Sequence, residues 1–253
     1  MAEKIGVLVV AHGSRSSRWV RLVDDAAKQV KTKHPLTVGF LELVEGRKIQ
    51  DGIDALEAQG VDRIFAIPLF ASSGSKHIEE IRFMLGLTGR LPAAPDAAPL
   101  NVNAKVVMSP AMDDHPIIAE MLAGRIRCLI RKPEEEAVLL VGHGNELPGF
   151  KEKWEAGMNG LVKQLRRKFP LACITFASLA SDELRKRVDA LSQKYRVLVL
   201  PLFLSEGYFT DQLIPSRLEG LKVEYFKSAY LPDPGVSRWM EAMVEELKKK
   251  TKS

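Results

Sequence analysis

The 253 residues predict an α/β protein with two similar halves, each built around a parallel sheet flanked by helices. Short apolar runs alternate with helical patterns along the chain, as a series of βαβ units requires. The first run, residues 5–11, is apolar throughout, which is typical of a strand buried on both faces. The same motifs then occur a second time in the same order, which indicates an internal duplication.

The first half begins with the strand 5–11. A helix follows it, because Trp19, Val23 and other apolar residues recur at spacings of three and four, with Ser16 or Ser17 as the N-cap. The other expected elements of this half are the strands 37–42, 63–70 and 105–109 and the helices 47–59 and 77–86. Prolines 92, 95 and 99 among alanines predict a loop over 88–104.

The second half repeats this pattern. The expected elements are the strands 137–142, 172–178, 197–204 and 222–228 and the helices 150–168, 182–194, 210–219 and 234–249. The boundary falls near the sequence RKPE that begins at Arg131. We therefore divide the chain into residues 1–131 and 132–253.

The two halves align through shared motifs. AHG at 11–13 matches GHG at 142–144, and PLF at 68–70 matches PLF at 201–203. In this alignment the matched pairs are Phe40 with Phe176, Glu42 with Ser178, Glu45 with Ser181, and His77 with Phe209 or Thr210. Of the polar groups His12, Glu42 and His77 in the first half, only His12 has a counterpart of the same type in the second half, which is His143. The second half is therefore expected to be a scaffold whose site has lapsed.

Composition narrows the class of protein. Apolar residues make up 46% and charged residues 27%, and no apolar run reaches the roughly 18 residues that span a bilayer. Cys128 and Cys173 form no CxxC pair, which suits a reducing compartment. The net charge is +5, but the cations are scattered, without the aromatic and basic interleaving of nucleic-acid binding. We expect a cytoplasmic protein that binds neither membranes nor nucleic acids.

Polar side chains follow three neighbouring strands of the first half. His12 ends the first strand, Glu42 ends the second with Glu45 just beyond it, and His77 follows the third after a Ser/Gly loop. Because ligands bind at the carboxyl ends of parallel strands, these groups should meet at one rim, where Gly13 permits close approach to His12. Imidazole suits late first-row divalent metals, and two imidazoles with one carboxylate leave other coordination positions open.

Two further histidines have structural explanations. His34 aligns with Phe169, so an apolar ring can replace it. His115 precedes Pro116 near a helix start, which indicates a cap or turn, with metal binding the less favoured role.

The chain resembles the class II tetrapyrrole chelatases, the sirohydrochlorin cobaltochelatases and ferrochelatases. The resemblance lies in AHGSR at 11–15, FLELVEG at 40–46, IPLFASSGSKHIEEI at 67–81 and their second-half counterparts, and covers nearly the whole chain. It implies two flavodoxin-like halves facing across a cleft and insertion of Co²⁺ or Fe²⁺ into sirohydrochlorin without ATP, toward cobalamin or sirohaem. The metal is then a substrate, and no permanent cofactor is expected.

The resemblance also implies roles for residues. His12, Glu42 and His77 would be the catalytic and metal-binding groups, with Glu45 as the rival of Glu42. Substrate contacts are expected at Gly13, Ser14, Arg15, Ser73 and Gly74, and Arg15 and Lys76 are candidates for binding the substrate's carboxylates. A fused pair of halves is expected to act as a monomer.

Other functions remain open at this point. A non-enzymatic metal-binding or metal-delivery protein would use the same ligands. A histidine phosphatase is less favoured, because Ala11 stands where that superfamily has an arginine before its histidine. A serine hydrolase is weaker still, because the chain lacks G-x-S-x-G.

Overall fold

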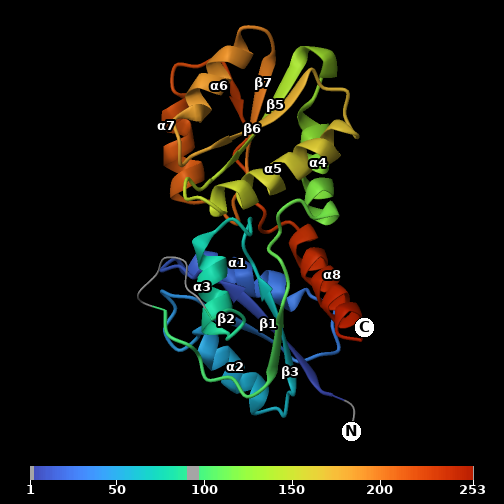
Figure 1. Ribbon diagram of the computed structural model, residues 1–253. Helices are drawn as coiled ribbons and strands as arrows, with labels where there is room; N and C mark the ends of the chain where they lie inside the picture. Colours follow the sequence, from blue (N-terminus) through green and yellow to red (C-terminus); the bar gives the residue numbers. More distant parts are fainter. Residues whose placement is uncertain (1–2, 90–96, 253) are drawn as a thin grey trace. The chain divides into compact units, whose positions relative to one another are not determined.

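The computed structural model describes residues 3–89 and 97–252, which form two compact units (Figure 1). Unit 1 comprises the described residues of Met1–Phe70, Ser75–Met112 and Pro234–Ser253. Unit 2 comprises Ala71–Gly74 and Asp113–Asp233.

Unit 1 contains a four-stranded parallel sheet in the order β2-β1-β3-β4. Its strands are β1 (Ile5–Ala11), β2 (Leu36–Phe40), β3 (Arg63–Pro68) and β4 (Lys105–Met108). Its helices are α1 (Ser17–Lys28), α2 (Ile49–Glu57), α3 (Lys76–Met84) and α8 (Gly235–Lys250). Strand order reverses between β1 and β3, and in such sheets the carboxyl ends of the strands beside this point form the usual ligand site.

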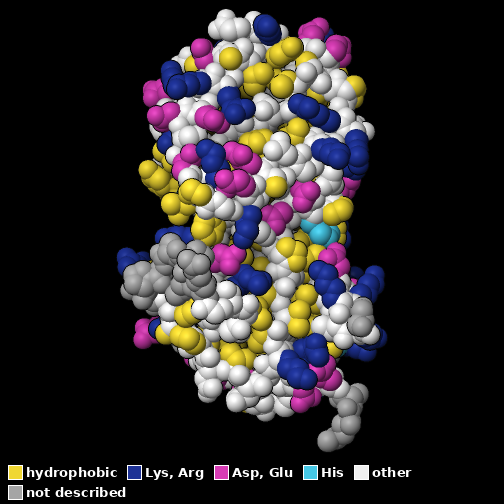
Figure 2. All heavy atoms as spheres, in the orientation of Figure 1, with side chains coloured by type: hydrophobic (Ala, Val, Ile, Leu, Met, Phe, Trp, Pro, Cys, Tyr) yellow, Lys and Arg dark blue, Asp and Glu magenta, His cyan; other side chains and the backbone are white. Residues whose placement is uncertain are grey.

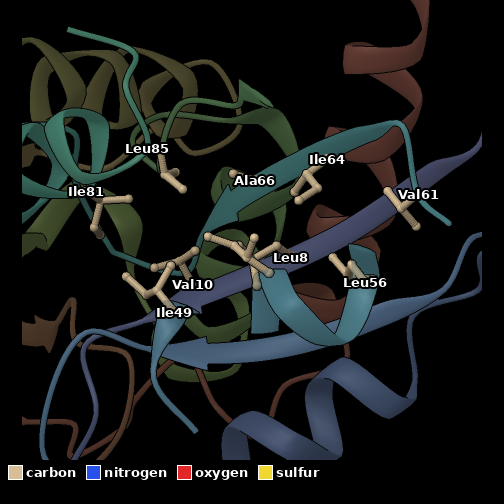
Figure 3. Close-up of a cluster of buried hydrophobic side chains, with 10 residues drawn as sticks. Leu8, Val10, Ile49, Leu56, Val61, Ile64, Ala66, Ile81 and Leu85 are labelled. Atoms are coloured by element: carbon tan, nitrogen blue, oxygen red, sulfur yellow. The ribbon is translucent and has the colours of Figure 1, made fainter. Parts of the chain in front are cut away.

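Both faces of the unit 1 sheet are covered. Leu8 and Val10 pack with α2 and α3 in one apolar cluster (Figure 3). Val7 and Val9 are equally buried and must point to the opposite face, because side chains alternate along a strand. There α1 and α8 pack together, and the Ser237 hydroxyl donates to the Ala26 carbonyl at 2.9 Å. The predicted strand 5–11 is therefore confirmed as one buried on both faces.

Unit 2 repeats this design with the sheet order β6-β5-β7-β8. Its strands are β5 (Glu136–Gly142), β6 (Cys173–Ser178), β7 (Arg196–Pro201) and β8 (Glu224–Tyr225). Its helices are α4 (Pro116–Leu129), α5 (Phe150–Arg166), α6 (Glu183–Ser192) and α7 (Ile214–Leu218), with a 3-10 turn at Pro133–Glu135 and a π-helical turn at Phe209–Leu213. The prediction of two similar α/β halves with parallel sheets is confirmed.

The compact units do not follow the division of the sequence at 131–132. Helix α4 lies in the first sequence repeat but belongs to unit 2, where Lys168 of the α5 C-terminal turn bonds Glu120. Helix α8 lies in the second repeat but belongs to unit 1, where its Trp239 is fully buried. Each repeat thus supplies its last helix to the other unit, and local sequence patterns carry no signal of that exchange.

Several predicted elements differ from the structure. The predicted helix start at Pro116 is confirmed, but the extent of α4 was not predicted, because its apolar residues cover more than one face and leave no single stripe. The predicted helix 210–219 is a π-helical turn followed by the short α7. The predicted strand 222–228 is reduced to the two paired residues of β8, which has β7 as its partner at the edge of the sheet. The other predicted strands and helices are confirmed within a few residues at each end.

The predicted loop 88–104 is described only in part. Residues 90–96, which include Pro92 and Pro95, lie outside the described residues. Residues 97–103 form no helix or strand, and the Leu100 amide donates to the carbonyl of Met84 at the end of α3.

The surface has mixed charge. Figure 2 shows Lys and Arg side chains interspersed with Asp and Glu on the face in view. None of the helices in the described part of the chain is long and apolar enough to cross a membrane.

His34 should make unit 1 less stable in mild acid. Burial, together with Lys248 and Lys33, lowers the pKa of His34, and Glu245 and the Ile5 backbone only partly oppose this. The unfolded chain therefore binds more protons, so the free energy of unfolding should fall as the pH drops below about 6.5, the ordinary histidine value. His34→Phe should flatten this fall between pH 7.5 and 5, as measured by urea denaturation.

The second repeat provides the matched control for His34. Phe169 occupies the aligned position, is buried, and has the Arg127 guanidinium 5.8 Å from its ring. The free energy of unfolding of Phe169→His should therefore fall more steeply in acid than that of the parent. If the free energy of unfolding depended on pH equally in the parent and in His34→Phe, His34 would not be the cause of the loss of stability in acid.

Candidate functional site

The site begins at the end of β1, where His12 follows the buried strand. The next residue, Gly13, has a φ of +101°, and a Cβ atom there would lie 1.8 Å from the Glu42 carbonyl oxygen. Only glycine fits this position without moving the backbone. The chain past β1 can therefore run close beside the chain past β2, where the Glu42 amide donates to the His12 carbonyl at 3.0 Å.

Glu42 is the carboxylate that lies beside His12. Its Oε1 is 3.3 Å from His12 Nε2, while the imidazole is about one-third exposed and the carboxylate about half exposed. Glu45 is exposed farther along the same loop. Of the two carboxylates in the predicted motif, the structure brings Glu42 to the imidazole.

His77 reaches the same place from α3. Ser75 caps this helix, since its hydroxyl accepts from the His77 amide at 3.3 Å. The His77 ring meets the His12 ring edge-on, with centroids 4.8 Å apart, and the Phe70 ring lies 6.3 Å behind it. The three predicted groups from the ends of three neighbouring strands thus converge at one rim of unit 1.

The contacts of Nδ1 indicate the tautomer of each imidazole ring. His12 Nδ1 lies 3.1 Å from the Gly13 carbonyl oxygen, and His77 Nδ1 lies 2.7 Å from Glu80 Oε2. Both acceptors require a proton on Nδ1, so Nε2 of each neutral ring keeps its lone pair. In His12 this nitrogen faces the Glu42 carboxylate, and the pair is favourable when a proton or a cation lies between the two atoms. Within residues 3–89 and 97–252, no three His, Cys, Asp or Glu side chains form a ready-made metal cluster, so the site consists of these pairwise contacts.

The predicted substrate-contacting residues lie in different surroundings. Ser14 accepts a hydrogen bond from the Ser16 amide at the start of α1, and Arg15 is exposed. Ser73 and Gly74 belong to unit 2. The Ser73 hydroxyl donates to Asp113 at 2.5 Å, and a Cβ atom on Gly74 would lie 2.7 Å from atoms of Phe150 and Trp154. Ser73 is thus hydrogen-bonded and Gly74 closely packed within unit 2, and their contact with a substrate stays a prediction.

The corresponding rim of unit 2 corrects the alignment of the repeats. The amide that donates to the His143 carbonyl belongs to Ala180, at 2.9 Å, so Ala180 and not Ser178 is the counterpart of Glu42. Ser178 pairs with Gly142 as Phe40 pairs with Ala11, so Phe176 is not the counterpart of Phe40. A two-residue shift in the alignment of β6 with β2 keeps every side chain on the same face of the sheet. The apolar pattern of the sequence could therefore not reveal this shift.

Phe209 takes the place of His77 in unit 2. Its ring meets His143 edge-on at 5.1 Å and stacks on Phe203, as His77 lies between His12 and Phe70. Buried Ile81 follows His77 by four residues, whereas buried Ile214 follows Phe209 by five. The extra residue produces the π-helical turn, and the open choice between Phe209 and Thr210 is thereby resolved. His143 keeps its Nδ1 contact with the Gly144 carbonyl, and among the described residues no ion pair with a carboxylate and no ring contact with an imidazole is seen for it.

Sequence reasoning missed Glu80. Its side chain is 16% exposed and contacts His77, which lies three residues earlier on α3. This i, i+3 spacing on a helix was the available signal, because residues so placed share a face. Among the other histidines, His115 caps α4 by accepting from the Ile117 amide at 3.2 Å, in agreement with its predicted capping role.

Two flavodoxin-like units, one of which carries two imidazoles and a carboxylate at its rim, define a chelatase-like α/β protein. The family model described as CbiX matches the chain twice, over residues 6–129 and 137–251. The chain therefore belongs to the CbiX family, and the two matches coincide with the two sequence repeats.

Curated relatives match parts of the chain. One is the sirohydrochlorin cobaltochelatase of Methanopyrus kandleri, 28% identical over 137 residues, which are 49% of this chain and 95% of the relative. Another is the sirohydrochlorin cobaltochelatase of Sulfolobus acidocaldarius, 31% identical over 104 residues, which are 41% of this chain and 84% of the relative. These relatives thus correspond in length to about half of this chain.

Two solved structures share the whole fold. SirB from Bacillus subtilis with Fe³⁺ has a TM-score of 0.74 at 20% identity, covering 96% of this chain and 95% of its own. The CbiX structure described as the terminal enzyme for biosynthesis of sirohaem in denitrifying bacteria has a TM-score of 0.63 at 16% identity, covering 95% and 98%. At these identities the likeness concerns the fold alone, and it confirms the prediction of two similar chelatase-like α/β halves.

Proposed function

We propose that the protein inserts a divalent metal ion, Co²⁺ or Fe²⁺, into sirohydrochlorin without ATP. The observation that carries the proposal is the meeting of His12, Glu42 and His77 at the rim of unit 1, with imidazole centroids 4.8 Å apart and Glu42 3.3 Å from His12. The sirohydrochlorin cobaltochelatases among the relatives support the choice of substrate and of reaction.

The chemistry asks for groups that bind a cation and accept protons. Metal insertion exchanges one divalent ion for the two pyrrole N–H protons of the macrocycle. The net charge of the macrocycle therefore does not change, and the proposed reaction uses no ATP. The Nε2 lone pairs of His12 and His77 can hold the ion or take these protons. Glu42 stabilises the positive charge beside His12. Two imidazoles and one carboxylate leave coordination positions open, as transfer to the ring requires.

Substrate binding calls for cations. Sirohydrochlorin carries eight carboxylates, and Arg15 and Lys76 are exposed on the loop after β1 and at the start of α3. Both segments adjoin the residues of the site. We assign these two cations to the peripheral carboxylates of the substrate.

The test is an absorption assay of metal insertion. Purified protein should convert sirohydrochlorin with Co²⁺, or with Fe²⁺ under anaerobic conditions, faster than the same mixture without protein, and without added ATP. Parallel assays with Co²⁺ and Fe²⁺ show which metal the protein inserts faster.

Other outcomes would replace the proposal. An unchanged rate together with stoichiometric binding of the metal would indicate a metal-delivery protein. Release of phosphate from phosphomonoesters, without metal insertion, would indicate a histidine phosphatase.

A further inference from the structure

Glu80 forms the most direct side-chain contact that either imidazole of the site makes. Its Oε2 lies 2.7 Å from His77 Nδ1, and the Glu80 and His77 side chains are 16% and 27% exposed. A partly buried carboxylate is stabilised by a donor, and a charge-assisted hydrogen bond in such surroundings is stronger than one at the open surface. The contact therefore restrains the orientation of the His77 ring.

The contact also selects one tautomer of His77. A carboxylate accepts only, so Nδ1 must carry the proton, and Nε2 of the neutral ring is left with its lone pair. Turning the ring over would break the bond to Glu80. His12 obtains the same tautomer from the main-chain carbonyl of Gly13, whereas His77 depends on a side chain.

The repeat provides an internal control for this assignment. Since Ile81 corresponds to Ile214, Glu80 corresponds to Leu213, and His77 corresponds to Phe209. Where the imidazole is a phenyl ring, the carboxylate is an apolar side chain. Glu80 is thus present in the unit that has a ring nitrogen to bond and absent from the unit that does not.

A favourable interaction with the N-terminus of α3 does not account for Glu80. Glu79 occupies the first turn of that helix and lies 3.8 Å from Arg82. Glu80 instead contacts the ring of His77.

We propose that Glu80 is a positioning residue that holds His77 with Nδ1 protonated and presents Nε2 to the metal ion. The role of Nε2 as a ligand rests on the proposed function. The orientation and tautomer of the ring do not, so the two ideas can fail separately. Partners of this kind behind metal-binding histidines change metal affinity by about 10- to 100-fold when removed.

The test compares Glu80→Ala, Glu80→Gln and the control Glu79→Gln, each with all 253 residues. Nitrogen-15 NMR of labelled histidine at pH 8.5 reports the His77 tautomer without metal or substrate. Calorimetry with Co²⁺ alone reports the affinity, and the metal insertion assay gives kcat and KM. Thermal unfolding shows that each variant is folded.

We expect the parent and Glu79→Gln to show His77 protonated at Nδ1. Glu80→Ala should shift His77 toward protonation at Nε2, weaken Co²⁺ binding about 10- to 100-fold and lower kcat with little change in KM for sirohydrochlorin. Glu80→Gln should retain part of the affinity, because its amide oxygen still accepts from Nδ1. That graded rescue is not expected of a residue needed only for packing.

Two results would overturn the proposal: a parent protein with His77 protonated at Nε2, or a Glu80→Ala variant with unchanged tautomer and Co²⁺ affinity. A tautomer shift in Glu80→Ala, in a protein that does not accelerate metal insertion, would retain the positioning role and reject the chelatase function.

Discussion

His12→Ala is expected to abolish the acceleration of sirohydrochlorin metal insertion, a loss of about 100-fold or more for a group that binds the ion or accepts its protons. His12 is the central residue of the site, because it contacts both of the others. Its Nε2 lies 3.3 Å from Glu42 Oε1, and its ring centroid lies 4.8 Å from that of His77. The measurement is the initial rate of the absorption change with Co²⁺.

His143→Ala is the matched control for this variant. His143 also ends a first strand, its Nδ1 contacts the next carbonyl, and its ring meets an aromatic neighbour edge-on. That neighbour is Phe209, which offers no lone pair, so the rate should stay within about twofold of the parent. If both variants lost activity, or neither did, the idea of one functional rim in unit 1 would be rejected.

Gly13→Ala is expected to lower the rate of metal insertion about 100-fold, because a shift of about 1 Å in a reacting group can cost that much. A methyl group at Gly13 would lie 1.8 Å from the Glu42 carbonyl oxygen, and its φ of +101° disfavours any side chain. The loop after β2 must move away, and the Glu42 carboxylate moves with it. The variant should also unfold at lower temperature.

Substitutions at two other glycines separate the loss of stability from the loss of activity. Gly46→Ala introduces a side chain at a φ of +70° in open space and should cost about 1 kcal/mol of stability while activity is kept. Gly144→Ala in unit 2 would bring its methyl group 1.7 Å from Ser178 Oγ, so it should destabilise unit 2 without affecting the rate per folded molecule. Full activity in Gly13→Ala would show that the spacing between β1 and β2 is not critical.

The topology could be predicted because its signals are local. The apolar run 5–11 identified a strand buried on both faces, and parallel strands bring their carboxyl ends together. That geometry alone placed His12, Glu42 and His77 at one rim, although they are far apart in the sequence. The duplication then identified His143 as a histidine without its partners.

What could not be predicted depends on contacts that leave no local pattern. The two-residue slip that exchanges Ser178 for Ala180 preserves the alternation of faces, so only the strand register reveals it. The exchange of α4 and α8 between units is a matter of tertiary packing. Glu80 was recognisable by its spacing from His77, but on a helix rich in charges the spacing alone did not distinguish it from a solvent-exposed residue.

The placement of α8 has a consequence for biogenesis. Unit 2 ends at Asp233, whereas unit 1 needs the helix that begins at Gly235 to cover Val7 and Val9. A nascent chain leaving the ribosome can therefore complete unit 2 before unit 1. Unit 1, which carries His12 and His77, is begun earlier but stays incomplete until α8 emerges.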